Sequence, residues 1–228
     1  MTNKRLRKIM AYIYMPLFFT LIGYGIIIIS VIPFIGTVST VGSIITSDGV
    51  PDFSTDLNIL YDEDKAKEAA VANTDSVELK EITMPYYGTQ YGVISCSRIS
   101  LNAPLFFGDN PTILRSGIGQ YIGSSIPGFN MPILLCGHNT TYCLPLSYIE
   151  AGDIITIETN YGTYEYKVSH TEVHHMNDSS AYNLSQNKEQ LIIYTCYPFN
   201  IVGNKVNRLF VYADKISGPD VSGLNSQP

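Results

Sequence analysis

The 228-residue sequence contains no tryptophan, only four cysteines and only 15% charged residues. Four cysteines in a chain of this length are too few for a small domain held together by disulfides. Acidic residues are absent before Asp48, so all 20 Asp and Glu residues lie in the remainder, which is net negative. A negatively charged body repels a phosphate backbone, and we predict no binding of nucleic acid. With 45% hydrophobic residues the chain can bury one domain core and is too apolar to be disordered throughout.

Charge is also absent from Ile9 to Ser47, directly after basic residues at positions 4, 5, 7 and 8. About 20 apolar residues cross the hydrocarbon of a bilayer, and a preceding basic cluster favours the cytoplasmic side. The sequence therefore predicts a single-pass protein of the cell membrane, with residues 1–8 as a cytoplasmic tail and residues 9–36 as a transmembrane anchor. The rest would be extracellular. The alternative is a cleaved signal peptide, but its apolar region would normally span only about 7–15 residues.

The extracellular part divides by composition. Residues 37–86 are predicted to form a stalk with one short helix over Leu60–Asn73, and residues 217–228 a polar tail. Between them, short runs rich in Val, Ile, Tyr and Thr are separated by turn residues, which indicates an all-β closed barrel or sandwich. The expected strands are Tyr91–Ile99, Pro132–Cys136, Ile154–Thr159, Thr163–Val173, Gln190–Cys196 and Arg208–Ala213.

Three chemically active side chains lie at the ends of predicted strands. Cys196 ends the run Leu191-Ile-Ile-Tyr-Thr-Cys, Arg208 opens the next strand, and His138 follows the run Pro132-Ile-Leu-Leu-Cys-Gly. A thiol, an imidazole and a guanidinium are the groups needed for acyl transfer: the first attacks a carbonyl, the second moves protons and the third orients the substrate or stabilises the oxyanion. Spacing alone leaves the alternative that these residues only pack.

The segment Ile192-Ile-Tyr-Thr-Cys196 resembles the Thr-Leu-x-Thr-Cys signature of the sortases, Gram-positive transpeptidases that join proteins to the cell wall. Cys136-Gly-His138-Asn resembles the region of the family's catalytic histidine, and Asn207-Arg208-Leu-Phe-Val that of its arginine. The resemblance extends from Tyr91 to Asp214, and the step from Cys196 to Arg208 is most like class D. His138 precedes Cys196, which is the reverse of the order in papain-like proteases.

The resemblance implies a closed β-barrel of about eight strands with short helices over residues 87–216, without a cofactor or a metal. It implies Cys196 as nucleophile, His138 as general acid/base and Arg208 as the orienting group. The enzyme would cleave Leu-Pro-x-Thr-type sorting signals through a thioester and pass the protein to an amine of the peptidoglycan precursor lipid II. The alternatives are a pilin-polymerising sortase and a catalytically inactive extracellular binding domain. The residues expected to contact substrate are Thr195, Tyr197, Pro198 and Asn139.

The other cysteines and histidines have more than one interpretation. Cys136 and Cys143 flank His138 and could form a disulfide, but we favour buried thiols, the commonest state of a free cysteine. His170 and His174 would share one face of a strand and His175 the other. We favour surface histidines over a metal site there, because no further ligand completes the set.

Three acidic residues, Asp109, Glu150 and Asp153, could contribute to a calcium site of the kind that some sortases have. Their spacing is not diagnostic of calcium binding, and we favour solvated acids.

Overall fold

The computed structural model describes residues 14–25, 57–72, 75–199 and 205–223. The chain divides into two compact units, Met1–Asp52 and Phe53–Pro228. In the first unit, residues 14–25 are helical. Within the described residues, no helix combines the length and the apolarity needed to span a membrane. Most of the predicted anchor and all of the predicted cytoplasmic tail lie outside the described residues.

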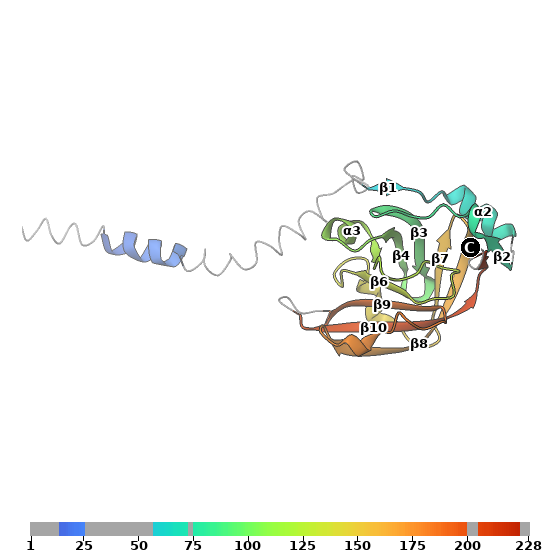
Figure 1. The fold of residues 1–228 in the computed structure, drawn as a ribbon. Helices are drawn as coiled ribbons and strands as arrows, with labels where there is room; N and C mark the ends of the chain where they lie inside the picture. Colours follow the sequence, from blue (N-terminus) through green and yellow to red (C-terminus); the bar gives the residue numbers. More distant parts are fainter. Residues whose placement is uncertain (1–13, 26–56, 73–74, 200–204, 224–228) are drawn as a thin grey trace, which may run out of the picture. The chain divides into compact units, whose positions relative to one another are not determined.

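Eight strands of the second unit form a closed barrel in the order β3-β4-β5-β6-β9-β10-β8-β7, and pairing of β7 with β3 closes it (Figure 1). This confirms the predicted closed barrel of about eight strands. The short strand β1 (Asn58–Ile59) pairs in parallel with β3. The barrel strands are β3 (Thr89–Cys96), β4 (Leu101–Phe107), β5 (Ile118–Gln120), β6 (Ile133–Gly137), β7 (Ile154–Thr159), β8 (Gly162–His175), β9 (Gln190–Tyr197) and β10 (Asn207–Ser217).

Few helices accompany the described strands. The predicted helix is present as α2 (Glu63–Ala72), with Glu63 and Asp64 in its first turn, where acidic residues are favourable. An unpredicted helix, α3 (Pro111–Ser116), begins where the Asn110 side chain accepts a hydrogen bond from the Ile113 amide at 2.8 Å. The 3₁₀ turns are η1 (Leu79–Glu81), η2 (Ser97–Ile99), η3 (Leu144–Tyr148) and η4 (Ser179–Ala181).

Alternation along the strands separates the barrel interior from its outer face. On β9, Leu191 and Ile193 are fully buried in the main core, whereas Ile192 belongs to a second apolar cluster. On β10, Leu209 and Val211 face the core and Phe210 joins the second cluster. We call this second group the outer cluster; it consists of Leu134, Ala181, Ile192, Phe210 and Tyr212, with Leu184 and Tyr194 packed against them.

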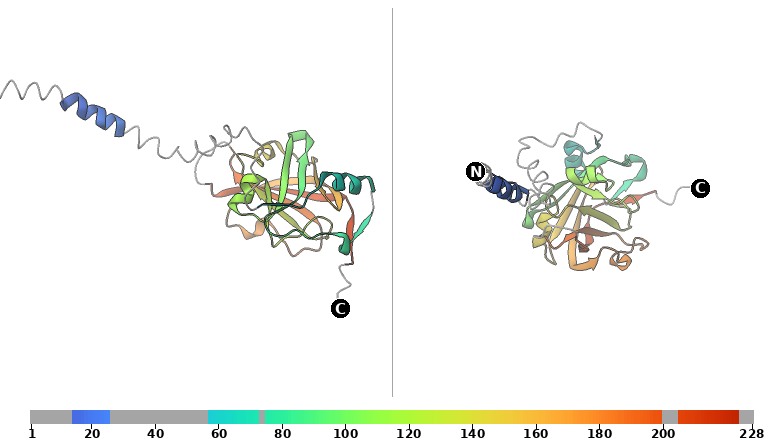
Figure 2. Two further views of the ribbon diagram at one scale, coloured as in Figure 1. Left: turned by 90° about the horizontal axis from the view of Figure 1, so that it is seen from above. Right: turned by 90° about the vertical axis from the view of Figure 1, so that its left-hand side faces the viewer.

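One end of the barrel is extended by elements that precede β3 and follow β10 in the sequence. Strands β2 (Ser76–Glu78) and β11 (Asp220–Ser222) pair in parallel, and α2 lies near the β7–β8 turn (Figure 2). The Asp62 amide donates to Asn160 Oδ1 in that turn at 2.8 Å. The folded part thus includes segments of the predicted stalk and of the predicted tail. We call this the distal end, because β6 and β9 finish at the opposite one.

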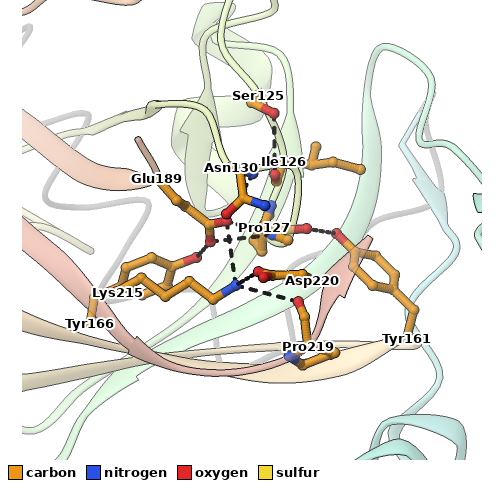
Figure 3. A network of polar contacts seen from close by, with 11 residues as sticks. Ser125, Ile126, Pro127, Asn130, Tyr161, Tyr166, Glu189, Lys215, Pro219 and Asp220 are labelled. Atoms are coloured by element: carbon orange, nitrogen blue, oxygen red, sulfur yellow. Dashed lines mark hydrogen bonds and ion pairs between the residues drawn. The ribbon is translucent and has the colours of Figure 1, made fainter. Parts of the chain in front are cut away.

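A buried carboxylate ties the distal end together (Figure 3). Glu189, which is only 4% exposed, accepts hydrogen bonds from the amides of Gly128 and Asn130 at 3.1–3.2 Å and from the Tyr166 hydroxyl at 2.6 Å. Lys215 Nζ lies 3.6 Å from Glu189 and 2.6 Å from Asp220. The loop before β6 and the strands β8, β9 and β10 therefore meet at one side chain.

Candidate active site

The strand register brings the three predicted catalytic residues to one level. Arg208 on β10 is the direct antiparallel partner of Cys196 on β9. On the other side of β9, Gly137 of β6 pairs with Thr195, so the next residue, His138, is carried to the level of Cys196. Residues that are far apart in the sequence thus occupy three adjacent strand positions, in the order His138, Cys196, Arg208.

These side chains belong to the outer face of the barrel. Cys196 continues the alternate positions of Ile192 and Tyr194, and Arg208 continues those of Tyr212 and Phe210, which are residues of the outer cluster or packed against it. Side chains two apart on a strand share a face. Cys196 is half-buried, so its thiol is on a rigid strand and partly open to solvent.

The Arg208 guanidinium is fixed at one of its nitrogens. Its Nη1 donates to the carbonyl oxygens of Lys205 at 2.7 Å and Asn207 at 2.9 Å. A guanidinium carries five N–H donors in a planar arrangement, so Nη2 and Nε keep donors that can serve a substrate oxygen.

His138 is exposed, but neighbouring protein atoms still remove part of its water. This desolvation and the positive charge of Arg115, in the last turn of α3, lower the pKa of the His138 imidazole below its usual 6.5. The neutral ring is therefore favoured at neutral pH, and a neutral imidazole can accept a proton from a thiol.

Replacing Arg115 with glutamine is expected to raise the pKa of His138, because the repelling charge is lost while the desolvation stays. Histidine ring protons followed by NMR over a pH titration measure this directly. His174, whose pKa is raised by Asp178 and Glu172 and not by any group of α3, serves as the control in the same spectra and should give the same curve in both proteins. An unaltered His138 titration in the Arg115→Gln protein would show that Arg115 does not act on the ring.

The four residues predicted to contact substrate are placed differently from one another. Thr195 is 1% exposed and donates to the Gly137 carbonyl at 2.7 Å, on the face opposite to Cys196. It is therefore a core residue, because strand alternation turns its side chain inward, and a substrate contact of Thr195 stays a prediction. Asn139 is also buried and donates to the Pro198 carbonyl at 3.2 Å, linking the segment after His138 to the one after Cys196. Tyr197 is 37% exposed and accessible beside Cys196.

A pocket opens beside Arg208. Its volume is about 370 Å³, within the usual range for ligand sites. Three aromatic rings, a guanidinium and a carboxylate make its walls both apolar and charged. It is lined by Met176, Asn177, Asp178, Ser179, Tyr182, Tyr194, Arg208 and Phe210.

All four cysteines are free thiols, so the alternative of a disulfide between Cys136 and Cys143 is wrong and the prediction of buried thiols is confirmed. Burial raises the pKa of the Cys136 thiol to about 12 and raises that of Cys143 further. Cys143 is fully buried and is hydrogen-bonded to the Thr195 side chain. Neither thiol is suited to form a thiolate at neutral pH.

Two of the acidic residues considered for calcium, Glu150 and Asp153, take part in other contacts. Asp153 is buried, and its carboxylate is paired with the guanidinium of Arg98, which lowers the pKa of Asp153. The second Asp153 oxygen also accepts from the Glu150 amide at 2.8 Å. Within the described residues no group of three or more potential ligands is arranged to hold a metal ion.

Comparison with known proteins agrees with this fold. The family model described as the sortase domain matches residues 94–216. The chain is 31% identical over 145 residues to Sortase D of Bacillus subtilis (strain 168), covering 64% of this chain and 73% of that protein.

Two solved structures share the fold. A Clostridium perfringens Sortase D5 transpeptidase aligns with a TM-score of 0.54 at 20% identity, over 69% of this chain and 91% of that one. Sortase C1 from Streptococcus agalactiae aligns with a TM-score of 0.54 at 23% identity, over 68% and 88%. Barrel, register and sequence together define a cysteine transpeptidase. The chain belongs to the sortase family.

Proposed function

We propose that this sortase cleaves a Leu-Pro-x-Thr-type sorting signal through a thioester on Cys196 and transfers the protein to a peptidoglycan amine. The observation that carries the proposal is the alignment of His138, Cys196 and Arg208 at one level of three adjacent strands. In the first step His138 takes the thiol proton of Cys196, the sulfur bonds to the threonine carbonyl carbon, the following peptide bond breaks, and His138 passes the proton to the departing amine. In the second step an acceptor amine attacks the thioester, giving an amide and the free thiol.

The pocket beside Arg208 supports the peptide-binding part of the proposal. Its aromatic walls suit the apolar side chain and the proline of such a signal, and it lies next to the guanidinium that would hold the carbonyl oxygen. The relative named Sortase D favours class D for this chain. A pilin-polymerising activity would differ in the acceptor, a lysine instead of the lipid II amine.

The location of the enzyme is also part of the proposal. A helix over residues 9–36 would anchor the protein in the cell membrane, with residues 1–8 in the cytoplasm and the barrel outside. The support is the uncharged segment Ile9–Ser47 and the basic cluster before it. An extracellular barrel at the membrane surface would meet both exported proteins and a lipid-linked acceptor.

Replacing Arg208 with lysine should lower kcat/KM for a sorting peptide on the order of 10²–10³-fold, as the loss of one oxyanion donor does in other acyl-transfer enzymes. An ammonium can replace the bonds to the Lys205 and Asn207 carbonyls but cannot also present a planar donor pair to the substrate. Steady-state kinetics measure the effect. Arg98→Lys, which alters the pair with Asp153 instead, is the control and should retain turnover. Turnover within threefold of wild type in the Arg208→Lys protein would remove Arg208 from the mechanism.

The proposed function is tested by incubating the full chain in detergent with a library of Leu-Pro-x-Thr-like peptides and measuring the intact mass. An adduct on Cys196 with the mass of the N-terminal peptide fragment is expected, and it reports the nucleophile and the signal together. Addition of amine nucleophiles should then release the adduct as an amide. A fully folded protein that forms no adduct with any peptide would favour the inactive binding domain.

A further inference from the structure

An imidazole lies between two carboxylates next to the Arg208 pocket. His174 on β8 is the ladder partner of Arg208 on β10. Its Nδ1 lies 2.8 Å from Asp178 Oδ2, and its Nε2 lies 2.8 Å from Glu172 Oε2. A neutral imidazole has one N–H and can donate to only one carboxylate, whereas the imidazolium donates to both. The arrangement is therefore complete only when the ring is protonated.

Asp178 connects this ring to the wall of the pocket. Its other oxygen, Oδ1, accepts from the Ser180 amide at 2.9 Å and from the Ser180 hydroxyl at 2.6 Å, at the start of η4. At the end of that turn the Ala181 carbonyl accepts from the Tyr212 hydroxyl at 2.6 Å. Asp178, Ser179 and Tyr182 of this segment line the pocket.

We propose that His174 is a positioning residue of the sortase site: its imidazolium, held between Glu172 and Asp178, fixes the pocket wall formed by residues 176–182 beside Arg208. The proposal rests on the proposed function, because the wall matters to catalysis only if a sorting peptide binds there. His174 does not touch the reacting atoms. It acts through Asp178 on the shape of the pocket, so its loss should weaken peptide binding more than it slows the chemical step.

The charges around His174 agree with a protonated ring. On its own strand it faces Glu172, whose other oxygen is 3.8 Å from His170, and the following turn contributes Asp178. From β10 the neighbours are Phe210, at 5.5 Å between ring centroids, and Arg208, whose Nη1 is bound to backbone carbonyls. The hydrogen bonds to Asp178 and Glu172 raise the pKa of His174 above its usual 6.5.

The sign of the pH dependence follows from this shift. A histidine whose pKa is higher in the folded protein than in the unfolded chain stabilises the fold fully below the unfolded pKa. The stabilisation is lost as the pH rises through the folded pKa. Asp178, whose pKa is lowered to about 2 first by Ser180 and then by His174, stays ionised throughout. The wall should therefore loosen as the pH rises through the folded pKa of His174.

The first test is the kinetics of the full chain and of His174→Gln between pH 5.5 and 9, with a fluorogenic Leu-Pro-x-Thr peptide that forms the adduct. In the wild type KM should rise with pH, and in His174→Gln it should be about tenfold above the low-pH wild-type value at every pH, which corresponds to about 1.4 kcal/mol. The kcat value should change less than about twofold. His170→Gln, a matched histidine on the same face of β8, should keep the wild-type profile. A wild-type KM profile in His174→Gln, or loss of the profile in His170→Gln as well, would overturn the proposal.

A second measurement does not need a substrate. Hydrogen exchange of the Asp178, Ser180 and Ala181 amides, each of which donates a hydrogen bond, reports directly on the wall. At pH 6 their protection should fall about tenfold in His174→Gln, while amides of β9 are unchanged. In the wild type, protection corrected for intrinsic exchange rates should fall as His174 loses its proton. If the His174→Gln protein does not fold, this wild-type measurement alone tests the proposal. Unchanged protection refutes the positioning role even if peptides are acylated, and reduced protection without any acylation refutes only the proposed function.

Discussion

Replacing Cys196 with alanine is expected to abolish both the acyl adduct and peptide cleavage. The thioester cannot form without the sulfur, and removal of a nucleophile from such a catalytic unit costs on the order of 10⁴-fold or more in kcat. Cys196 is the one cysteine that is not buried. It lies on the outer face, opposite Arg208. Intact-mass measurement and kinetics of the same protein preparation check the two losses separately.

The matched controls are Cys136→Ala and Cys143→Ala, which should keep activity. Burial raises the pKa of both thiols, so neither supplies a thiolate at neutral pH. Cys136 is the sharper control, because it shares the outer face and its thiol is hydrogen-bonded to the Tyr194 side chain. If Cys143→Ala alone stopped cleavage while the protein remained folded, the nucleophile would have to be reassigned.

The strands that carry the candidate site could be predicted because their patterns are strong. Gln190–Cys196 and Arg208–Ala213 were expected as strands, and the structure has β9 as Gln190–Tyr197 and β10 as Asn207–Ser217. Both are rich in β-branched and aromatic residues, which are enriched in strands. Cys196 and Arg208 lie near the ends of these two strands. Predicting the strand boundaries correctly was therefore enough to predict that the two residues are close together.

Strands β4 and β5 have no such pattern, and their residue composition alone does not predict them. Pro104 lies inside β4, and proline normally excludes a central strand. It is tolerated because pairing with β5 begins only at Leu105. β5 has three residues, and its Gly119 is required by a tertiary contact: a Cβ there would lie 2.5 Å from the Gly108 carbonyl oxygen. Strand propensity depends on residues that are close in the sequence, so it cannot reveal a tertiary contact of this kind.

The position of His174 depends on an irregularity that the sequence does not show. Along β8 the inward residues are Tyr164, Tyr166 and Val168, so regular alternation would turn His170 inward as well. A register shift pairs Val168 with Ala213 but His170 with Tyr212, which leaves Ser169 as an extra residue. His170 and His174 therefore share a face, as predicted, but that face is the outer one, beside Arg208.

Replacing Glu189 with alanine is expected to destabilise the barrel by about 3–5 kcal/mol, the cost of removing one partner from a buried ion pair. The amides of Gly128 and Asn130 and the Tyr166 hydroxyl lose their acceptor, and the largely buried Lys215 keeps the Pro219 carbonyl and the exposed carboxylate of Asp220. Such a loss is a large part of the 5–15 kcal/mol by which a typical domain is stable. Urea denaturation followed by circular dichroism measures the free energy of unfolding.

Glu165→Ala provides the matched control, because Glu165 lies on β8 next to Tyr166 and its carboxylate accepts an exposed hydrogen bond from Ser217. Its effect should be within about 0.5 kcal/mol. A similarly small effect of Glu189→Ala would mean that water replaces the carboxylate and that the network does not hold the distal end. A large effect has a consequence for the active site, since Glu189 immediately precedes β9, which carries Cys196 near its other end. The carboxylate that fixes the start of β9 then also fixes, through the ladder with β10, the level at which Cys196 meets Arg208.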